Sequence, residues 1–324
     1  MAFSIPTVAN AWRYPPGEPS SWDGYHSLEL RDVQVHAPGK GEVLVKIRAV
    51  TLNSRRDVKI CRGTYPLPGF TTGSDGKGLI PTSDGAGDIV AIGEDVTGWT
   101  IGDCDLECRD VYHNIGRLIV VDVHPIAHIF GPSIFPAKFI LPIPDHLSYE
   151  EGASTACAGI TAFNALFDSG ELTPDSTLLV LGSGGVSVLG AQFAKAAGAR
   201  VIATTSSQEK AQKYKELGVS HGTLMEAIRS LKAKGVVHLI GGSTEEAPTT
   251  AYRDLTLGLM SSGGKLNGVT PGGRDVAQRL DSFMTQHELK PLLDSRVFAW
   301  EEANKAFKYL ERGAHFGKVV IRVD

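Results

Sequence analysis

The sequence predicts an α/β protein of two domains, in which a β-rich domain precedes a doubly wound parallel sheet. Its 324 residues exceed the usual size of a single domain. Short β-branched segments such as 42–53 and 87–96, separated by Pro and Gly, are typical of a barrel-like domain. From about residue 150, strand-like and helix-like segments alternate, which is typical of a parallel sheet covered by helices.

The elements of the second half follow one another in a regular order. Residues 147–170 predict one or two helices, with Ser148 and Glu151 spaced as a capping box. The predicted strands are 177–182, 200–205, 236–242 and 265–269, and the predicted helices are 186–198, 207–218 and 224–235. A helix and a strand near the end have no place in this sheet and are predicted to return to the first domain. The predicted domain ranges are 1–155, 156–290 and 291–324.

Composition excludes several classes of function. The net charge is −4 without a basic block, so no nucleic-acid partner is expected, and no apolar run reaches the roughly 18 residues of a membrane span. Four cysteines in so long a chain do not form a disulfide framework. The first residues also lack the pattern of a secretory signal. We therefore expect a cytoplasmic protein that acts on a small molecule.

The segment GSGGVS, residues 182–187, lies between a predicted strand and a predicted helix. Gly182 allows a tight turn, Gly184 lets a pyrophosphate approach the backbone, and the helix N-terminus offers N–H groups. Ser187 stands where a third glycine is usual, but it adds only one small group. The alternative is a purely structural turn. The sequence predicts a dinucleotide site formed by Gly182, Ser183, Gly184, Gly185, Val186 and Ser187.

The end of the second strand indicates which dinucleotide binds. A carboxylate there would accept hydrogen bonds from a ribose 2′-hydroxyl and repel a 2′-phosphate. The chain instead offers hydroxyl groups and an ammonium, which suit a phosphate and predict NADPH. Alternatively, these are ordinary capping and solvated residues of the next helix. The predicted residues are Thr204, Thr205, Ser206, Ser207, Lys210 and Tyr214.

Several segments together resemble the medium-chain dehydrogenase/reductase superfamily. They are residues 43–57, 81–103, 143–166, the glycine loop and the closing HFGKVVIRV at 315–323. The loop and the strand after it are similar to the zinc-independent alcohol dehydrogenase-like and quinone oxidoreductase-like branch. The resemblance implies a GroES-like substrate domain, a Rossmann cofactor domain and a substrate cleft between them.

The resemblance also implies where a catalytic zinc would lie. Zinc-dependent members use Cys, His and a second Cys, whereas the matching positions here are Asn53, Ser83 and Cys157. One soft ligand of three is too few for zinc, so no metal is expected. The other side chains considered for a metal and set aside are Cys104, Cys108, His113, His124 and His128.

By resemblance, the substrate site contains Tyr65, Asn53 and Asp57, with Tyr65 as the proton donor or oxyanion contact. The alternative is that Tyr65 packs at the domain edge, Asn53 fixes a turn and Asp57 caps a helix. The resemblance further places Thr161, Gly241 and His315 at the cofactor.

Two stretches depart from the family pattern. Only VSHGT separates Gly218 from Leu224, which predicts the loss of one βα unit and about five strands in 177–290. Residues 104–141 are unusually apolar and replace the segment that lines the substrate pocket. We expect NADPH-dependent reduction of an activated C=C or C=O bond in a small, apolar or biosynthetic substrate, by a monomer or homodimer. The alternative is a diverged member with a lyase-type, cyclase-type or non-catalytic role.

Overall fold

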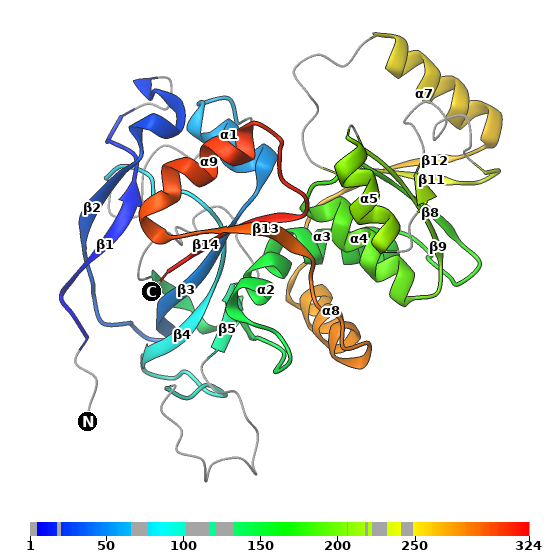
Figure 1. Cartoon of the computed structure of the whole chain (residues 1–324). Helices are drawn as coiled ribbons and strands as arrows, with labels where there is room; N and C mark the ends of the chain where they lie inside the picture. The colour runs from blue at the N-terminus through cyan, green and yellow to red at the C-terminus, as the bar shows by residue number, and fades with distance from the viewer. Residues whose placement is uncertain are drawn as a thin grey trace. The chain divides into compact units, whose positions relative to one another are not determined.

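The computed structural model describes residues 5–17, 21–65, 77–101, 117–120, 133–205, 207–217, 220–221, 232–240 and 249–323. The contacts of the chain divide it into two units (Figure 1). The first unit contains residues 1–157 and 273–324, and the second unit contains residues 158–272. Each unit is described separately below.

The first unit is built on a seven-stranded sheet with the order β13-β14-β3-β4-β5-β7, in which β6 also pairs with β3. Its strands are β3 (Glu42–Leu52), β4 (Asp84–Ile92), β5 (Arg117–Val120), β6 (Ser133–Pro136), β7 (Ile140–Pro142), β13 (Leu293–Phe298) and β14 (Lys318–Arg322). A separate antiparallel pair joins β1 (Val8–Arg13) to β2 (Glu29–Gln34). The C-terminal strand β14 pairs antiparallel with β3, so segments far apart in the sequence share one sheet.

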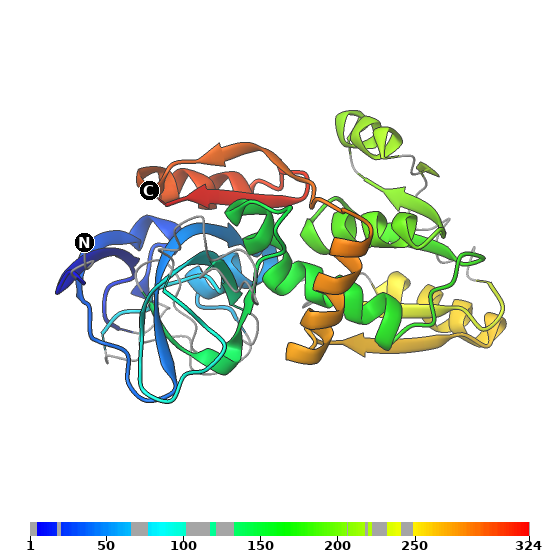
Figure 2. The ribbon, with the colours of Figure 1, turned by 90° about the horizontal axis from the view of Figure 1, so that it is seen from below.

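Helices complete the first unit. They are η2 (Gly24–Ser27), α1 (Ser54–Cys61), η3 (Ala137–Phe139), α2 (Tyr149–Ser154), α8 (Arg274–Gln286), η6 (Trp300–Glu302) and α9 (Ala303–Glu311). The predicted capping box is confirmed at α2, where Glu151 N donates to Ser148 Oγ at 3.2 Å and Ser148 N donates to Glu151 Oε2 at 2.8 Å. Figure 2 shows α9 beside β13 and β14. By its contacts α8 groups with the first unit, although its residues fall in the range 156–290 assigned to the cofactor domain from sequence.

One apolar core holds the first unit together. Alternate residues of β3, among them Val43, Val45 and Ile47, are almost fully buried, as expected for a strand at the centre of a sheet. Helix α9 adds Phe307 and Leu310 from one face of its surface. This core fixes β3 and β14, and the polar residues described below lie where these strands begin and end.

The second unit contains parallel strands. The strands β8 (Thr177–Leu181), β9 (Arg200–Thr204) and β10 (Ser220–His221) pair in the order β10-β9-β8, and β11 (Val236–Ile240) pairs with β12 (Lys265–Val269). Its helices are α3 (Ile160–Phe163), η5 (Asn164–Asp168), α4 (Gly185–Ala196), α5 (Gln208–Glu216) and α7 (Thr249–Ser262). The π-helical segment η4 (Thr155–Gly159) connects α2 to α3. All four predicted strands are present.

Three differences from the predicted elements concern the second unit. VSHGT contains the short strand β10, which pairs parallel with β9, where only a connection was expected. Helix α7 was not predicted. Residues 224–231 of a predicted helix lie outside the described part, and residues 232–235 form a turn rather than its last residues.

Candidate functional site

Five polar side chains meet in the first unit where strands β14, β3 and β4 lie side by side. Lys318 begins β14, Asp84 begins β4, and Asn53 follows the last residue of β3. In the sheet register Thr51 faces Asp84, and β14 pairs with the same end of β3. Ser83 directly precedes β4. The topology of the sheet therefore collects these residues, which are far apart in the sequence.

Hydrogen bonds link the five residues into one network. Lys318 Nζ donates to Asn53 Oδ1 at 2.7 Å and to Asp84 Oδ2 at 2.9 Å. Asn53 Nδ2 donates to Asp84 Oδ1 at 2.8 Å and to Ser83 Oγ at 3.3 Å. Ser83 Oγ donates to Asp84 Oδ1 at 2.7 Å, and Thr51 Oγ1 lies 3.5 Å from Asp84 Oδ2. The side chains of Lys318 and Asp84 are 3% and 0% exposed, so this ion pair is fully buried.

Asp57 lies beside this network, in the first turn of α1. Its carboxylate accepts a hydrogen bond from Asn53 N at 2.7 Å and another from Arg56 Nη1 at 2.9 Å. Burial raises the pKa of Asp57, and the guanidinium of Arg56 and the Asn53 N–H oppose that rise. The structure therefore brings Asn53 and Asp57 together, and the contacts of Asp57 are those of a helix cap.

Tyr65 and His315 are the other predicted site residues of the first unit. Tyr65 is half-buried and packs against the apolar core. His315 is buried in the turn before β14. Asp294 holds this turn, because its Oδ2 accepts a hydrogen bond from Phe316 N at 2.8 Å. Gly317 follows with φ +80°, and a Cβ there would lie 2.5 Å from Leu292 O, so the turn requires glycine.

Cys157 is the one predicted zinc position that holds a soft side chain. Burial raises the pKa of its thiol to about 12; the charge of Asp84 adds to this effect, and the charges of Lys318 and Arg56 oppose it. Burial therefore favours the protonated, uncharged form of this thiol. Among the described residues, no three His, Cys, Asp or Glu side chains lie close enough to hold a metal ion. Residues 102–116 and 121–132, with the remaining candidate ligands, lie outside the described part.

The predicted glycine loop of the second unit connects β8 to α4. Gly182 has φ +80°, and no heavy atom of the described residues lies within 4 Å of where a Cβ on Gly182 or Gly184 would stand. Gly184 is the N-cap of α4, and no side chain in the described part caps the helix. Ser187 Oγ donates to Leu181 O at 2.8 Å, so this hydroxyl stabilises the loop through the last residue of β8. Open space above glycines and uncapped N–H groups fit a pyrophosphate.

Strand β9 and helix α5 support this loop. Gly182 N donates to Thr204 O at 2.9 Å and lies 3.3 Å from Thr204 Oγ1. Tyr214 is fully buried, and its hydroxyl donates to Gly182 O at 2.7 Å. Burial raises the pKa of this hydroxyl. Tyr214 and Thr204, both predicted to contact the cofactor, therefore hold the loop in its conformation. This role of Tyr214 could not be predicted from the sequence.

The residues after Thr204 carry the groups predicted to select the cofactor. Thr205 Oγ1 is buried and has no hydrogen-bond partner among the described residues, as expected of a hydroxyl placed for a ligand. Ser207 caps α5, because its hydroxyl accepts a hydrogen bond from Lys210 N at 3.2 Å. Thr161 is buried in α3. Ser206 and Gly241 lie outside the described residues.

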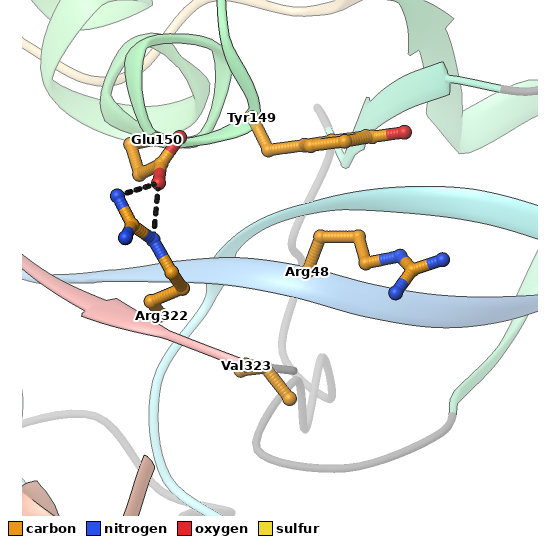
Figure 3. Close-up of a pocket in the computed structure, with 5 residues that line it drawn as sticks. All are labelled: Arg48, Tyr149, Glu150, Arg322 and Val323. Carbon is orange, nitrogen blue, oxygen red and sulfur yellow. Dashed lines mark hydrogen bonds and ion pairs between the residues drawn. The ribbon is translucent and has the colours of Figure 1, made fainter. Parts of the chain in front are cut away.

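One pocket lies apart from these residues, at β3, β14 and α2 of the first unit. It measures about 260 Å³ and is lined by Arg48, Tyr149, Glu150, Arg322 and Val323 (Figure 3). Arg322 Nε donates to Glu150 Oε1 at 2.7 Å. Arg48 forms an ion pair with Asp88 at 2.7 Å, and Asp88 also accepts a hydrogen bond from Tyr149. Because each guanidinium has a carboxylate partner, we assign this pocket no ligand.

Comparisons with known proteins identify the families that this chain resembles. A family model described as alcohol dehydrogenase GroES-like domain matches residues 39–118, and one described as zinc-binding dehydrogenase matches residues 216–321. No helix in the described residues is long and apolar enough to cross a membrane.

Two relatives and one solved structure indicate the range of similarity. A zinc-type alcohol dehydrogenase-like protein of Schizosaccharomyces pombe is 31% identical over 341 residues, which cover 91% of this chain and 96% of that protein. A quinone oxidoreductase of Pseudomonas aeruginosa is 28% identical and covers 91% of this chain and 87% of its own length. An acetophenone reductase of Geotrichum candidum, solved with NAD, shares the fold with a TM-score of 0.75 at 18% identity over 99% of both chains.

These similarities confirm the predicted fold class, a GroES-like domain together with a Rossmann domain. The chain belongs to the medium-chain dehydrogenase/reductase superfamily, whose members are oxidoreductases that bind a nicotinamide cofactor.

Proposed function

We propose that this protein is an NADPH-dependent, zinc-independent reductase of an activated C=C or C=O bond in a small molecule. The observation that carries the proposal is the glycine loop with open space above Gly182 and Gly184, followed by a second strand that ends in hydroxyl groups instead of a carboxylate. The similarity to a quinone oxidoreductase supports an acceptor of this kind. The scattered cysteines favour the cytoplasm as its location.

The proposal gives the residues of the second unit distinct tasks. The backbone of residues 182–187 and the N-terminus of α4 would hold the pyrophosphate. Thr205, with Ser206, Ser207 and Lys210, would hold the 2′-phosphate, whereas Thr204 and Tyr214 keep the loop in place. The hydroxyl of Thr205 has no hydrogen-bond partner among the described residues, which is compatible with this task. Thr161, Gly241 and His315 stay proposed cofactor contacts.

The buried network of the first unit supports zinc independence. A zinc site needs deprotonated or neutral soft ligands, whereas Asn53 and Ser83 are hard, neutral groups whose polar atoms are already bonded to one another and to Asp84. The ammonium of Lys318 already balances the carboxylate of Asp84. A divalent cation would have to displace this ammonium.

Hydride transfer needs positioning and stabilisation of the developing negative charge. When bound, the cofactor supplies the hydride, and the protein must orient the acceptor and deliver a proton. We propose Tyr65 as the proton donor or oxyanion contact and Asn53 and Asp57 as residues of the substrate site. Since the side-chain amide of Asn53 is held by three neighbours, its part is to shape the site rather than to donate a proton.

Turnover with two kinds of acceptor tests this proposal. The purified protein is incubated with NADPH and either 9,10-phenanthrenequinone or 2-cyclohexen-1-one, and the loss of NADPH absorbance and the product mass are measured. The expected product has gained two hydrogens, with one NADPH consumed for each product. A product of unchanged mass would support the lyase-type or cyclase-type alternative instead. The variant Tyr65→Phe is expected to lower kcat without changing NADPH affinity.

A further inference from the structure

Lys318 is a buried cation that the sequence did not mark as a site residue. Its side chain is 3% exposed, and its ammonium lies 2.7 Å from Asn53 Oδ1 and 2.9 Å from Asp84 Oδ2. A lysine is almost never fully buried unless it is paired. Here the ammonium has two acceptors, the carboxylate of Asp84 and the uncharged amide of Asn53. Lys318 therefore holds Asn53 as well as neutralising Asp84.

The ammonium decides how the amide of Asn53 is oriented. A lysine ammonium only donates hydrogen bonds, so Asn53 must turn Oδ1 toward Lys318. The Nδ2 group is then directed at Asp84 Oδ1, 2.8 Å away, and at Ser83 Oγ, 3.3 Å away. Ser83 in turn donates to Asp84. Without the ammonium, Asn53 Oδ1 loses the only donor that the described residues offer it, and only the bonds from Nδ2 to Asp84 and Ser83 still hold the amide.

The residue before this network is in a strained conformation. Thr82 has φ +73° and is 1% exposed, although a β-branched residue rarely adopts positive φ. Its hydroxyl has no hydrogen-bond partner among the described residues. Such strain persists only where the surroundings hold it. The hydrogen bonds of Ser83 and Asp84 anchor the chain directly after Thr82, and the ammonium of Lys318 anchors Asp84.

We propose that Lys318 is a positioning residue of the reduction site: its ammonium fixes Asn53 and the Thr82–Asp84 segment in the conformation that the reaction needs. The inference rests on the proposed function, in which Asn53 belongs to the substrate site. It predicts that loss of the ammonium lowers kcat while the binding of NADPH is unchanged.

The test replaces both charges of the pair. Lys318→Met alone would leave the buried carboxylate of Asp84 unpaired, which is strongly destabilising. The double variant Lys318→Met/Asp84→Asn removes both charges and keeps similar side-chain volumes. The matched control is Arg48→Met/Asp88→Asn, which removes an ion pair between β3 and β4, with a distance of 2.7 Å from Arg48 Nε to Asp88 Oδ2. Thermal unfolding of both variants is measured first, and the remaining measurements are made on folded protein.

The wild type and both variants are assayed with NADPH and 9,10-phenanthrenequinone. For Lys318→Met/Asp84→Asn we expect kcat to fall by about tenfold or more, because small displacements of positioning groups have large effects on rate. The Kd of NADPH should change by less than about twofold. The substituted residues lie in the first unit, whereas the glycine loop lies in the second unit and should stay intact. The control should retain the wild-type kcat. A double variant that is folded and keeps the wild-type kcat overturns the proposal.

A crystal structure of the double variant gives a second, independent test. The proposal requires the Asn53 amide or the Thr82–Asp84 segment to move, and unchanged positions of both would overturn it. If the wild type itself oxidises no NADPH with either acceptor, the proposed function fails, and the inference about Lys318 fails with it. Wild-type turnover together with an unimpaired double variant refutes the inference about Lys318 alone.

Discussion

Tyr214 shows how a residue expected to touch a ligand can act through the loop that binds it. The sequence placed it one helical turn after Lys210, near the predicted 2′-phosphate. In the structure its ring is buried and its hydroxyl donates to Gly182 O. The helical position could be predicted from spacing, but the direction of the side chain toward the loop after β8 depends on tertiary structure.

Tyr214→Phe should therefore weaken the loop rather than remove a cofactor contact. We expect a loss of about 1 kcal/mol in the free energy of unfolding, since one buried hydrogen bond is lost. NADPH should bind about three- to tenfold more weakly, because the turn at Gly182 is then less well held. Denaturant unfolding and a fluorescence titration measure the two effects. The control Tyr149→Phe, which removes a hydrogen bond to Asp88 in the first unit, should leave NADPH affinity unchanged. An equal effect of both variants would refute this role of Tyr214.

The network around Lys318 could not be predicted from sequence in the same way. Lys318, Asp84 and Asn53 come from three separate segments. A charged residue in a predicted strand is usually expected to be exposed to solvent. The one available signal was a lysine within the apolar closing run FGKVVIRV. Only the pairing of β14 with β3, and of β3 with β4, brings the three side chains together.

Among the elements, long periodic segments were the easiest to predict and short ones the hardest. The strands β8 and β9 and the helix α4 between them follow from their apolar patterns and the glycines. Strand β10 has two residues, too few for any period to show, and it forms because β9 offers it a free edge. The capping box of α2 was found because it depends on two residues three positions apart.

Helix α8 makes a prediction at the scale of one element. Its buried face includes Leu280 and Met284, and Asp281 lies beside them, where burial raises its pKa from the ordinary value of 3.8 to about 7. A carboxyl whose folded pKa is raised stabilises the fold at low pH, and this contribution is lost as the pH rises from about 4 to about 7. In Asp281→Asn this pH-dependent loss of stability should be absent. At pH values above 7 the free energy of unfolding of the variant should therefore exceed that of the wild type, by at most about 4 kcal/mol.

Urea unfolding of the wild type and Asp281→Asn at about pH 4 and about pH 8 measures this difference. The two proteins should be closest in stability at the lower pH and differ most at the higher pH. The control Asp275→Asn alters an aspartate on the same helix whose side chain is 79% exposed, and it should show no such trend. A constant difference between Asp281→Asn and wild type at both pH values would contradict the prediction.

The whole molecule consists of two units, each with its own buried aromatic side chains. Phe307 of α9 is fully buried in the first unit, and Phe193 of α4 is fully buried in the second. The change of composition near residue 150 indicated two parts. The grouping of α8 with the first unit could not be predicted from the sequence. It depends on tertiary contacts such as the hydrogen bonds from Arg274 to the carbonyl oxygens of Lys138 and Ile140.

Two separate cores predict two unfolding transitions. Phe307→Ala should lower the stability of one transition and Phe193→Ala that of the other, each by about 3–5 kcal/mol. NADPH should raise mainly the transition that Phe193→Ala affects, because most of the proposed cofactor contacts lie in that unit and a ligand stabilises the unit that binds it. Differential scanning calorimetry resolves the transitions. A single transition that both substitutions shift equally would show that the chain unfolds as one unit.

The hydroxyl-rich end of β9 is the feature that we propose selects NADPH over NADH. Isothermal titration calorimetry of the wild type with NADPH and NADH, repeated with Lys210→Glu, tests it most directly. We predict tighter binding of NADPH by about tenfold or more, and loss of that preference in Lys210→Glu, because a carboxylate repels the 2′-phosphate. The control Lys213→Glu, on the same helix, should keep the preference. Equal affinity for both cofactors in the wild type, or no NADPH binding at millimolar concentration, would contradict the account.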